Sequence, residues 1–277
     1  MSSDIKSRAA KTLFAILLCG AIGSPLLGAT SELRVCADPN NLPYSNQQQQ
    51  GFENALATLV ANDLGMNVSY FWYPQRHKFF HNTLQSGACD VVMEVPAGID
   101  AASTTVPYYR STYVFVSRQN LHIESFDDPR LRDLRIGVHL TGDGDEQIPS
   151  TEALLKRGLA QNIVGYSIFG NLSEQNPSSD IVRAVADNNI DVAVVWGPLG
   201  GYFAEHSSAQ LEATPVCAAA ADQHIPLAFD IAMGVRKGNE ELRDKLNAVI
   251  VRRRADIRKL LESYAVPLVE SQQLKCE

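Results

Sequence analysis

The sequence predicts an α/β protein built of two lobes that are joined by two crossing strands. Short apolar runs, which suit buried parallel strands, alternate along the chain with segments whose apolar residues have helical spacing. This alternation begins again near Asp133, so the same pattern of strands and helices occurs twice. Two strands, at 112–117 and 211–216, are expected to pass between the two halves.

Each half follows a β-α-β order, which predicts a parallel sheet with helices on both faces. Apolar residues at helical spacing give the first helix, and Gly65 is a typical helix end. The expected elements of the first half are strands at 33–37, 68–73, 90–95 and 112–117 and helices at 52–64 and 78–86. Those of the second half are strands at 133–138, 164–169 and 191–196 and helices at 151–157, 179–188 and 198–206.

The C-terminal part is expected to return to the first lobe. A strand at 229–235 adds to the first sheet, and helical spacing at 240–264 predicts a helix that covers it. The resulting lobe boundaries are 30–118 plus 215–277 for lobe 1 and 119–214 for lobe 2. Ligands of such sheets bind beyond the carboxyl ends of the strands, so we expect the site in the gap between the lobes.

The N-terminus has the features of a signal peptide. Lys6, Arg8 and Lys11 form a basic segment, and a short apolar segment at 12–23 follows it. Cleavage after residue 29 gives an exported, periplasmic protein, and the alternatives are an uncleaved membrane anchor or a lipid anchor at Cys19. The cleaved segment 1–29 carries three cations and one anion, so the net charge changes from −7 to −9. An acidic chain disfavours nucleic acid as a partner.

Four cysteines remain after cleavage: Cys36, Cys89, Cys217 and Cys276. In an oxidising compartment four cysteines allow three pairings. We expect Cys36–Cys89 and Cys217–Cys276, because each pair would join elements of one lobe. The cysteine and histidine spacings contain no metal-binding motif, so neither a metal nor a cofactor is expected.

One segment carries a family resemblance. An apolar strand at 91–93, a loop of small residues, Pro107-Tyr108-Tyr109 and an alternating run at 113–116 follow one another. This order resembles the first lobe of the periplasmic solute-binding proteins of family 3, which bind amino acids. The resemblance implies a two-lobed, periplasmic-binding-protein-like (type II) fold.

The amino-acid clamp of that family is missing here. In the family, an Arg before Pro-Tyr forks onto the ligand carboxylate, and an Asp after a second-lobe strand accepts from the ligand ammonium group. Gly98 and Ile99 stand near the place of the Arg, and Trp196 stands in the place of the Asp. The sequence therefore disfavours binding of a free amino acid by the family mechanism.

Segments spread over the whole chain are similar to one branch of this family, the binding-protein-like component encoded with quinoprotein methanol dehydrogenases. The matching segments are 34–43, 51–54, 89–93, 104–116, 127–131, 135–139, 191–199, 229–231 and 264–269. This resemblance implies a non-enzymatic accessory protein that assists maturation or activation of a methanol dehydrogenase dependent on pyrroloquinoline quinone. The partner is expected to be the apo form, and its metal is calcium or a lanthanide.

Several side chains are candidates to line the cleft or to contact the partner. They are Asp38, Asn40, Tyr44, Trp72, Glu94, Tyr108, Arg110 and Trp196. Six of them end, follow or lie late in an expected strand, whereas Tyr108 and Arg110 come just before the strand at 112–117. Aromatic and Arg side chains dominate binding hot spots. Turn formation, core packing and surface solvation are the structural alternatives for these residues. Glu94 departs from the branch, where Gly is expected.

Two other classes of function stay open at this stage. An importer's substrate-binding protein would take a small neutral solute, or the cleft would take a peptide segment. An enzyme of this fold needs an acid/base pair, and Glu94 is the only candidate for it that the sequence suggests. No catalytic residue is therefore assigned.

Overall fold

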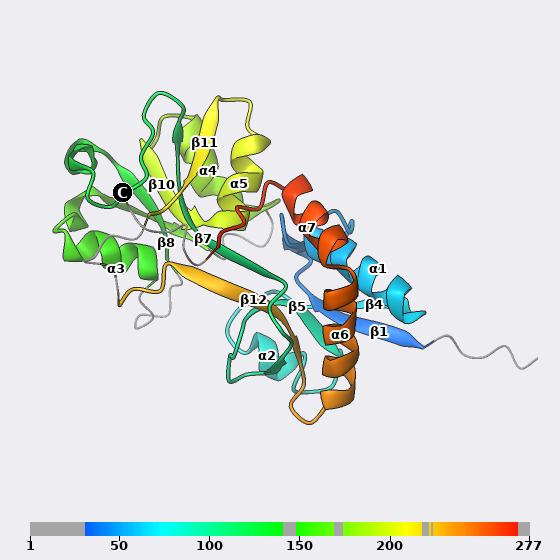
Figure 1. Cartoon of the computed structure of the whole chain (residues 1–277). Coiled ribbons are helices and arrows are strands. Elements are labelled where there is room, and N and C mark those ends of the chain that lie inside the picture. Colours follow the sequence, from blue (N-terminus) through cyan, green and yellow to red (C-terminus); the bar gives the residue numbers. More distant parts are fainter. Residues whose placement is uncertain (1–30, 141–147, 169–173, 218–221, 223, 271–277) are drawn as a thin grey trace, which may run out of the picture.

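The chain folds into two α/β lobes with a cleft between them. This computed structural model describes residues 31–140, 148–168, 174–217, 222 and 224–270. Figure 1 shows one lobe formed by the blue, cyan and orange-red parts of the chain and the other formed by the green and yellow parts. The predicted signal peptide and Cys276 lie outside the described residues. The predicted lobe boundaries stay a prediction.

The first lobe contains both ends of the described chain. Its elements are β1 (Glu32–Ala37), β2 (Asn40–Asn41), β3 (Ser45–Asn46), α1 (Phe52–Leu64), β4 (Asn67–Trp72), α2 (Phe79–Asn82), β5 (Val91–Pro96), β6 (Ser103–Thr104), β12 (Ala228–Val235), α6 (Glu240–Arg252) and α7 (Arg254–Ser263). Those of the second lobe are β8 (Ile136–Leu140), α3 (Pro149–Lys156), β9 (Ile163–Ser167), α4 (Asp180–Ala186), β10 (Val192–Trp196), α5 (Gly197–Glu205) and β11 (Leu211–Pro215).

One long strand, β7 (Tyr109–Arg118), passes from lobe to lobe. The strand order is β4-β1-β5-β12-β7-β10-β8-β9, and β11 also pairs with β7. The beginning of β7 pairs with β12, with Thr112 opposite Ala228, whereas its remainder pairs with β10 and β11 in the second lobe. Within each lobe the neighbouring strands β1 and β4, and β8 and β9, run parallel, as the β-α-β order predicts.

Each lobe has its own hydrophobic core. In the first lobe, Phe52, Leu56 and Val60 of α1 are fully buried against β1, β5 and β12. Figure 1 shows α1, α6 and α7 on one side of these strands and α2 on the other. In the second lobe, α3 packs on one face of the strands, and α4 and α5 pack on the other. The contacts of each lobe therefore form a core of their own.

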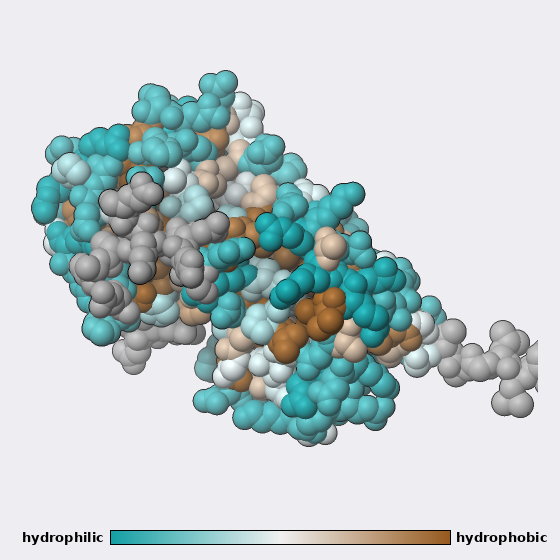
Figure 2. Space-filling model, viewed as in Figure 1, coloured by the Kyte–Doolittle hydropathy of each residue, from teal (hydrophilic) through white to brown (hydrophobic). Residues whose placement is uncertain are grey.

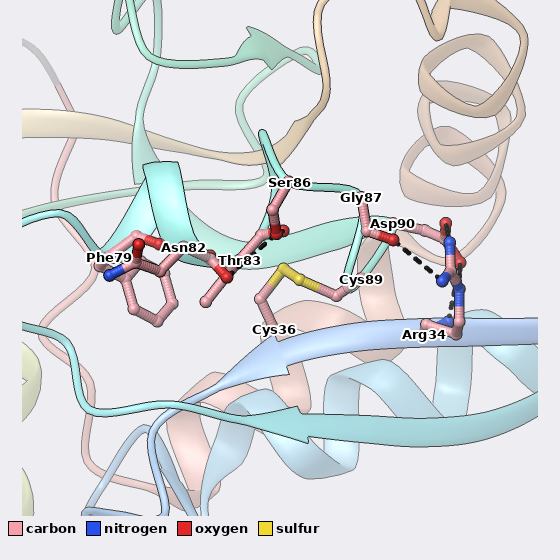
Figure 3. The surroundings of a disulfide bond; sticks show 9 residues. All are labelled: Arg34, Cys36, Phe79, Asn82, Thr83, Ser86, Gly87, Cys89 and Asp90. Carbon is pink, nitrogen blue, oxygen red and sulfur yellow. Dashed lines mark hydrogen bonds and ion pairs between the residues drawn. A yellow bond between two sulfur atoms is a disulfide. The ribbon is translucent and has the colours of Figure 1, made fainter.

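A disulfide between Cys36 and Cys89 ties β1 to the start of β5, which confirms the predicted pairing. The two Cα atoms are 5.4 Å apart. Figure 3 shows an ion pair beside it, in which Arg34 Nε donates to Asp90 Oδ2 at 2.9 Å. Arg34 Nη1 also donates to the carbonyl of Gly87 at 3.0 Å, so three contacts fix the same junction. Cys217 is also disulfide-bonded.

The surface of the described chain is mainly polar on the face that Figure 2 shows. Figure 2 shows a mainly hydrophilic face on which hydrophobic residues form small patches rather than one continuous area. Large exposed apolar side chains are scattered over both lobes: Phe71, Val106, Leu140, Leu155, Val164 and Val251. Among the described residues, no helix has the length and apolar character needed to cross a bilayer.

Candidate functional site

A cavity of about 740 Å³ lies between the two lobes. Residues that end or follow strands of both lobes form its wall. Asp38 follows β1 and Glu94 lies in β5 of the first lobe, whereas His139 lies in β8 and Trp196 ends β10 of the second. The carboxyl ends of parallel strands meet at this edge, which is where α/β folds build ligand sites.

Asp38 holds the loops at the cavity wall. Its Oδ1 accepts from the backbone N–H of Asn40 at 2.8 Å, and its Oδ2 accepts from the backbone N–H of Gln75 at 2.6 Å. Burial raises the pKa of Asp38, and the two N–H donors and the nearby Arg76 oppose that rise. Both carboxylate oxygens are engaged, so Asp38 positions other residues.

Asn40 connects the lobes across the cleft. Its Nδ2 donates to the carbonyl of Glu174 at 2.6 Å, and its Oδ1 accepts from the N–H of Asn176 at 3.0 Å. Both partners are backbone groups of the second lobe. A second polar contact between the lobes joins Trp196 Nε1 to Glu94 Oε1 at 3.4 Å. These contacts stabilise a closed arrangement of the two lobes.

Two carboxylates, Glu53 and Glu94, line the cavity without a cationic partner among the described residues. Glu53 lies in the first turn of α1 and is only 2% exposed. Burial raises the pKa of Glu94 to about 7, although the hydroxyl of Tyr109 and the indole of Trp196 lower it. Burial, with the charges of Glu94 and Asp38, also raises the pKa of Glu53 well above its ordinary value. Burial therefore favours the protonated form of Glu53 at neutral pH and leaves Glu94 only partly ionised.

Aromatic rings form the side of the cavity where the lobes meet. The Trp196 ring lies edge-to-face against Tyr113 at 5.6 Å and against Phe229 at 5.7 Å between centroids. Tyr44 also lines the cavity, and its ring packs edge-to-face on Phe52 at 5.5 Å. Such perpendicular pairs are the favoured aromatic geometry, so the rings are fixed in place.

His139 adds a neutral polar group from the second lobe. Only 6% of it is exposed, and burial lowers its pKa to about 4, against a smaller raising effect of the Ser178 backbone. Its Nε2 is buried and has no hydrogen-bond partner among the residues that the structure describes. At neutral pH this imidazole is therefore uncharged and has one ring nitrogen available.

The structure brings five of the eight candidate residues to the cavity wall. They are Asp38, Asn40, Tyr44, Glu94 and Trp196. Whether they bind a ligand or a partner stays a prediction.

Three candidate residues lie away from the cavity wall. Trp72 stacks on Tyr70 at 4.6 Å between centroids, beside the first-lobe core. Tyr108 donates its hydroxyl to the carbonyl of Met93 at 2.9 Å. Arg110 Nη1 forms an ion pair with Asp230 Oδ1 at 3.1 Å, so Arg110 has a structural role within the first lobe.

Among the wall residues that were not predicted from the sequence are Glu53, Tyr113, His139 and Phe229. An acidic residue in the first turn of a helix usually complements the helix dipole at the surface. The sequence therefore gives no reason to expect that Glu53 is buried. His139 had a usable signal, because it follows the apolar strand residues Ile136 and Val138. Tyr113 and Phe229 belong to expected strands. Whether their side chains reach the cavity depends on how the two lobes meet, which the sequence does not show.

Within 31–140, 148–168, 174–217, 222 and 224–270, no group of three or more His, Cys, Asp or Glu side chains is placed to hold a metal ion. The cavity instead offers two carboxylates, one neutral imidazole and an aromatic wall. This set of groups suits an organic ligand or an inserted side chain better than a coordinated ion.

Two α/β lobes, a strand that crosses between them and a cavity at their junction define a cleft-closing binding protein. Comparison with known proteins supports this class. Residues 33–266 match the family of bacterial extracellular solute-binding proteins, family 3. The chain therefore belongs to this family.

Relatives within the family are similar over most of their length. Protein MoxJ of Methylorubrum extorquens (strain AM1) is 31% identical over 245 residues, covering 86% of this chain and 81% of MoxJ. The crystal structure of periplasmic binding protein XoxJ from Methylobacterium extorquens AM1 has a TM-score of 0.71 and 33% identity. That of MxaJ from Methlophaga aminisulfidivorans MPT has a TM-score of 0.75 and 25% identity. Both matches cover 86% of this chain and 100% of the other, and they confirm the predicted branch and fold.

Proposed function

We propose that the chain is a periplasmic accessory protein of methanol oxidation that has no enzymatic activity of its own. In this proposal it binds a methanol dehydrogenase dependent on pyrroloquinoline quinone, in its apo form, and assists its maturation or activation. The similarity to MoxJ, XoxJ and MxaJ over 86% of the chain carries the proposal. The sequence resemblance to proteins encoded with such dehydrogenases supplies the partner.

The altered cleft supports a role other than capture of amino acids. Trp196 ends β10, at the place where family members carry the Asp that accepts from the ligand ammonium group. An indole only donates hydrogen bonds, so it cannot replace that carboxylate. Trp196 instead contacts the first lobe through Phe229 and Glu94.

Reconstitution of the dehydrogenase tests the proposal. The apo-dehydrogenase of the same host is mixed with pyrroloquinoline quinone and either Ca²⁺ or a lanthanide ion, with and without residues 30–277 of this chain. We expect a faster or larger recovery of methanol oxidation when the chain is present. Equal recovery in both mixtures contradicts a maturation role, and a gain seen only with preloaded enzyme assigns activation instead.

Two modes of contact are compatible with the proposal. In one, the cleft admits a segment of the dehydrogenase, and in the other an outer face binds it. Trp196→Asp places a charge inside the cavity, whereas Val251→Asp places the same charge on α6, where Val251 is 72% exposed. Loss of binding in Trp196→Asp alone assigns the cleft.

The cavity favours a second candidate, the substrate-binding protein of an importer for a small solute. A volume of about 740 Å³ is within the range of small-molecule pockets. A ligand that binds only the folded state raises the melting temperature by mass action. Thermal scans with alcohols, amines and sugars test this candidate, and the absence of any shift contradicts it.

A further inference from the structure

The wall of the interlobe cavity is strongly biased toward negative charge. Four acidic residues line it: Asp38, Glu53, Glu94 and Glu174. Among the described residues of the wall, Arg76 is the one side chain with a permanent positive charge. It acts on Asp38, whose pKa it lowers. The deep pair, Glu53 and Glu94, therefore receives no compensation from a cation of the described chain.

Polar atoms of this wall are buried without a partner. Glu53 is 98% inaccessible to solvent, and no hydrogen bond or ion pair reaches its carboxylate from the described residues. Within the described part of the chain, Oε2 of Glu94 and Nε2 of His139 are also buried without a hydrogen bond of good geometry, although the nearby Tyr109 hydroxyl lowers the pKa of Glu94. Burying a polar group without a hydrogen bond is costly, and such groups in a cavity are those that a ligand satisfies.

Aromatic faces complete the same cavity. Trp196, Tyr113 and Phe229 form an edge-to-face group at 5.6 and 5.7 Å between centroids, and Trp196 Nε1 lies 3.4 Å from Glu94 Oε1. The carboxylate pair and the rings are thus neighbours rather than separate regions. A cation over an aromatic face is attracted by the negative charge of that face, and the attraction increases when water is excluded.

We propose that the cleft binds an organic monocation, an ammonium or guanidinium group, between the carboxylates of Glu53 and Glu94 and the rings of Trp196, Tyr113 and Phe229. The cation supplies the charge that the wall lacks, and its N–H or N–CH₃ groups fit an aromatic lining. A coordinated metal ion fits less well, because no group of three or more His, Cys, Asp or Glu side chains is placed to ligate one among the described residues. Such a cation site does not require that a dehydrogenase binds the chain.

One pair of ligands tests the charge directly. Choline and 3,3-dimethylbutan-1-ol have nearly the same shape, but only choline is charged. We expect millimolar choline to raise the melting temperature of residues 30–277 and to give saturable heat in calorimetry, whereas the neutral alcohol does neither. An equal response to both ligands, or no response to choline, methylammonium, guanidinium and Nα-acetyl-lysine amide, overturns the proposal. This comparison uses the native chain, so it does not depend on a variant that folds.

The source of the cation is distinguished by the same probes. A solute site responds to choline or methylammonium and ignores Nα-acetyl-lysine amide. A site for a partner's side chain shows the reverse preference. Either result supports a cation site.

A matched pair of variants identifies the carboxylate. Glu94→Gln keeps the shape of the side chain and removes its charge, and we expect it to weaken cation binding at least tenfold. Glu240→Gln makes the same change on the exposed first turn of α6 and should leave binding unchanged. Equal affinity in both variants and in the native chain contradicts the assignment of Glu94.

The pH dependence gives a further test. The titratable groups that face Glu94 are Tyr44, Glu53, Tyr108 and Tyr109, and no described lysine, arginine or histidine pairs with it. A cation favours the ionised carboxylate, so its binding releases a proton. Because the pKa of Glu94 is about 7, the affinity for choline should rise about tenfold from pH 6 to pH 8. A flat profile contradicts a role for this pair.

Discussion

Glu94 is the residue at which folding and binding have opposite requirements. Its carboxylate lies in the closed cleft, where Oε2 has no hydrogen-bond partner from the described chain and burial raises the pKa to about 7. The folded chain therefore prefers the neutral form, whereas a cationic ligand would prefer the ionised form. A group under such a conflict is typical of a site rather than of a core.

Stability should depend on pH through Glu94. The folded pKa of about 7 is above the ordinary value of 4.5, so this group contributes stability that is fully present below about pH 4.5 and lost as pH rises through 7. We expect Glu94→Gln to gain about 1–3 kcal/mol relative to the native chain at pH 8 and little at pH 4.5. Urea unfolding at both pH values measures this, with Glu240→Gln as the control that keeps the native pH slope. An equal gain in unfolding free energy at both pH values would contradict a raised pKa of Glu94 in the folded chain.

Among the helices, the sequence predicts the bounds best where the spacing of the apolar residues and the residues typical of a helix end agree. Helix α1 has the predicted bounds, because its buried stripe ends at Gly65, which adopts a left-handed φ of 66°. Helix α2 ends at Asn82 instead of at 86. The hydroxyls of Thr83 and Ser86 bind the carbonyls of Phe79 and Asn82 and compete with the helical pattern.

The predicted helix at 240–264 is in fact two helices. Both halves keep the same apolar period, so the sequence contains no sign of the break between α6 and α7. The break at Arg253 depends on tertiary contacts. Asp63 of α1 pairs there with Arg252 and, at 2.6 Å, with Arg253.

The junction of β1 and β5 should depend on its disulfide. Cys36 and Cys89 close a segment with a sequence separation of 53. We expect the variant Cys36→Ser/Cys89→Ser to lose about 2–4 kcal/mol of unfolding free energy, mainly through a less constrained unfolded chain. Urea unfolding with and without reductant measures this difference. The native chain should lose stability on reduction, and a double variant as stable as the oxidised native chain would contradict the prediction.

At the scale of the whole molecule, the two-lobed fold could be predicted, but the composition of the cleft could not. The order of strands and helices along the chain indicates the fold, whereas the cavity wall combines residues from 38 to 231 that belong to both lobes. Glu53 and His139 illustrate this, since each has an ordinary role in its own element. Closure of the lobes makes them neighbours of one cavity.

Asn40 should control that closure. It bonds to the backbone of Glu174 and Asn176 across the cleft, whereas its neighbour Asn41 bonds to Gln75 within the first lobe at 3.0 Å. We expect Asn40→Ala to increase the radius of gyration in small-angle X-ray scattering, and Asn41→Ala to leave it unchanged. Identical scattering of both variants and the native chain would show that other contacts hold the lobes together.

The proposed role as an accessory protein of a methanol dehydrogenase is tested most directly by a binding measurement. The quantity to measure is the affinity of residues 30–277 for the methanol dehydrogenase of the same host, in apo and cofactor-loaded forms. Calorimetry or sedimentation at physiological salt provides it. We expect saturable binding that is tighter for the apo form. No binding of either form at concentrations up to ~100 μM, near −5.5 kcal/mol on the affinity scale, would contradict it.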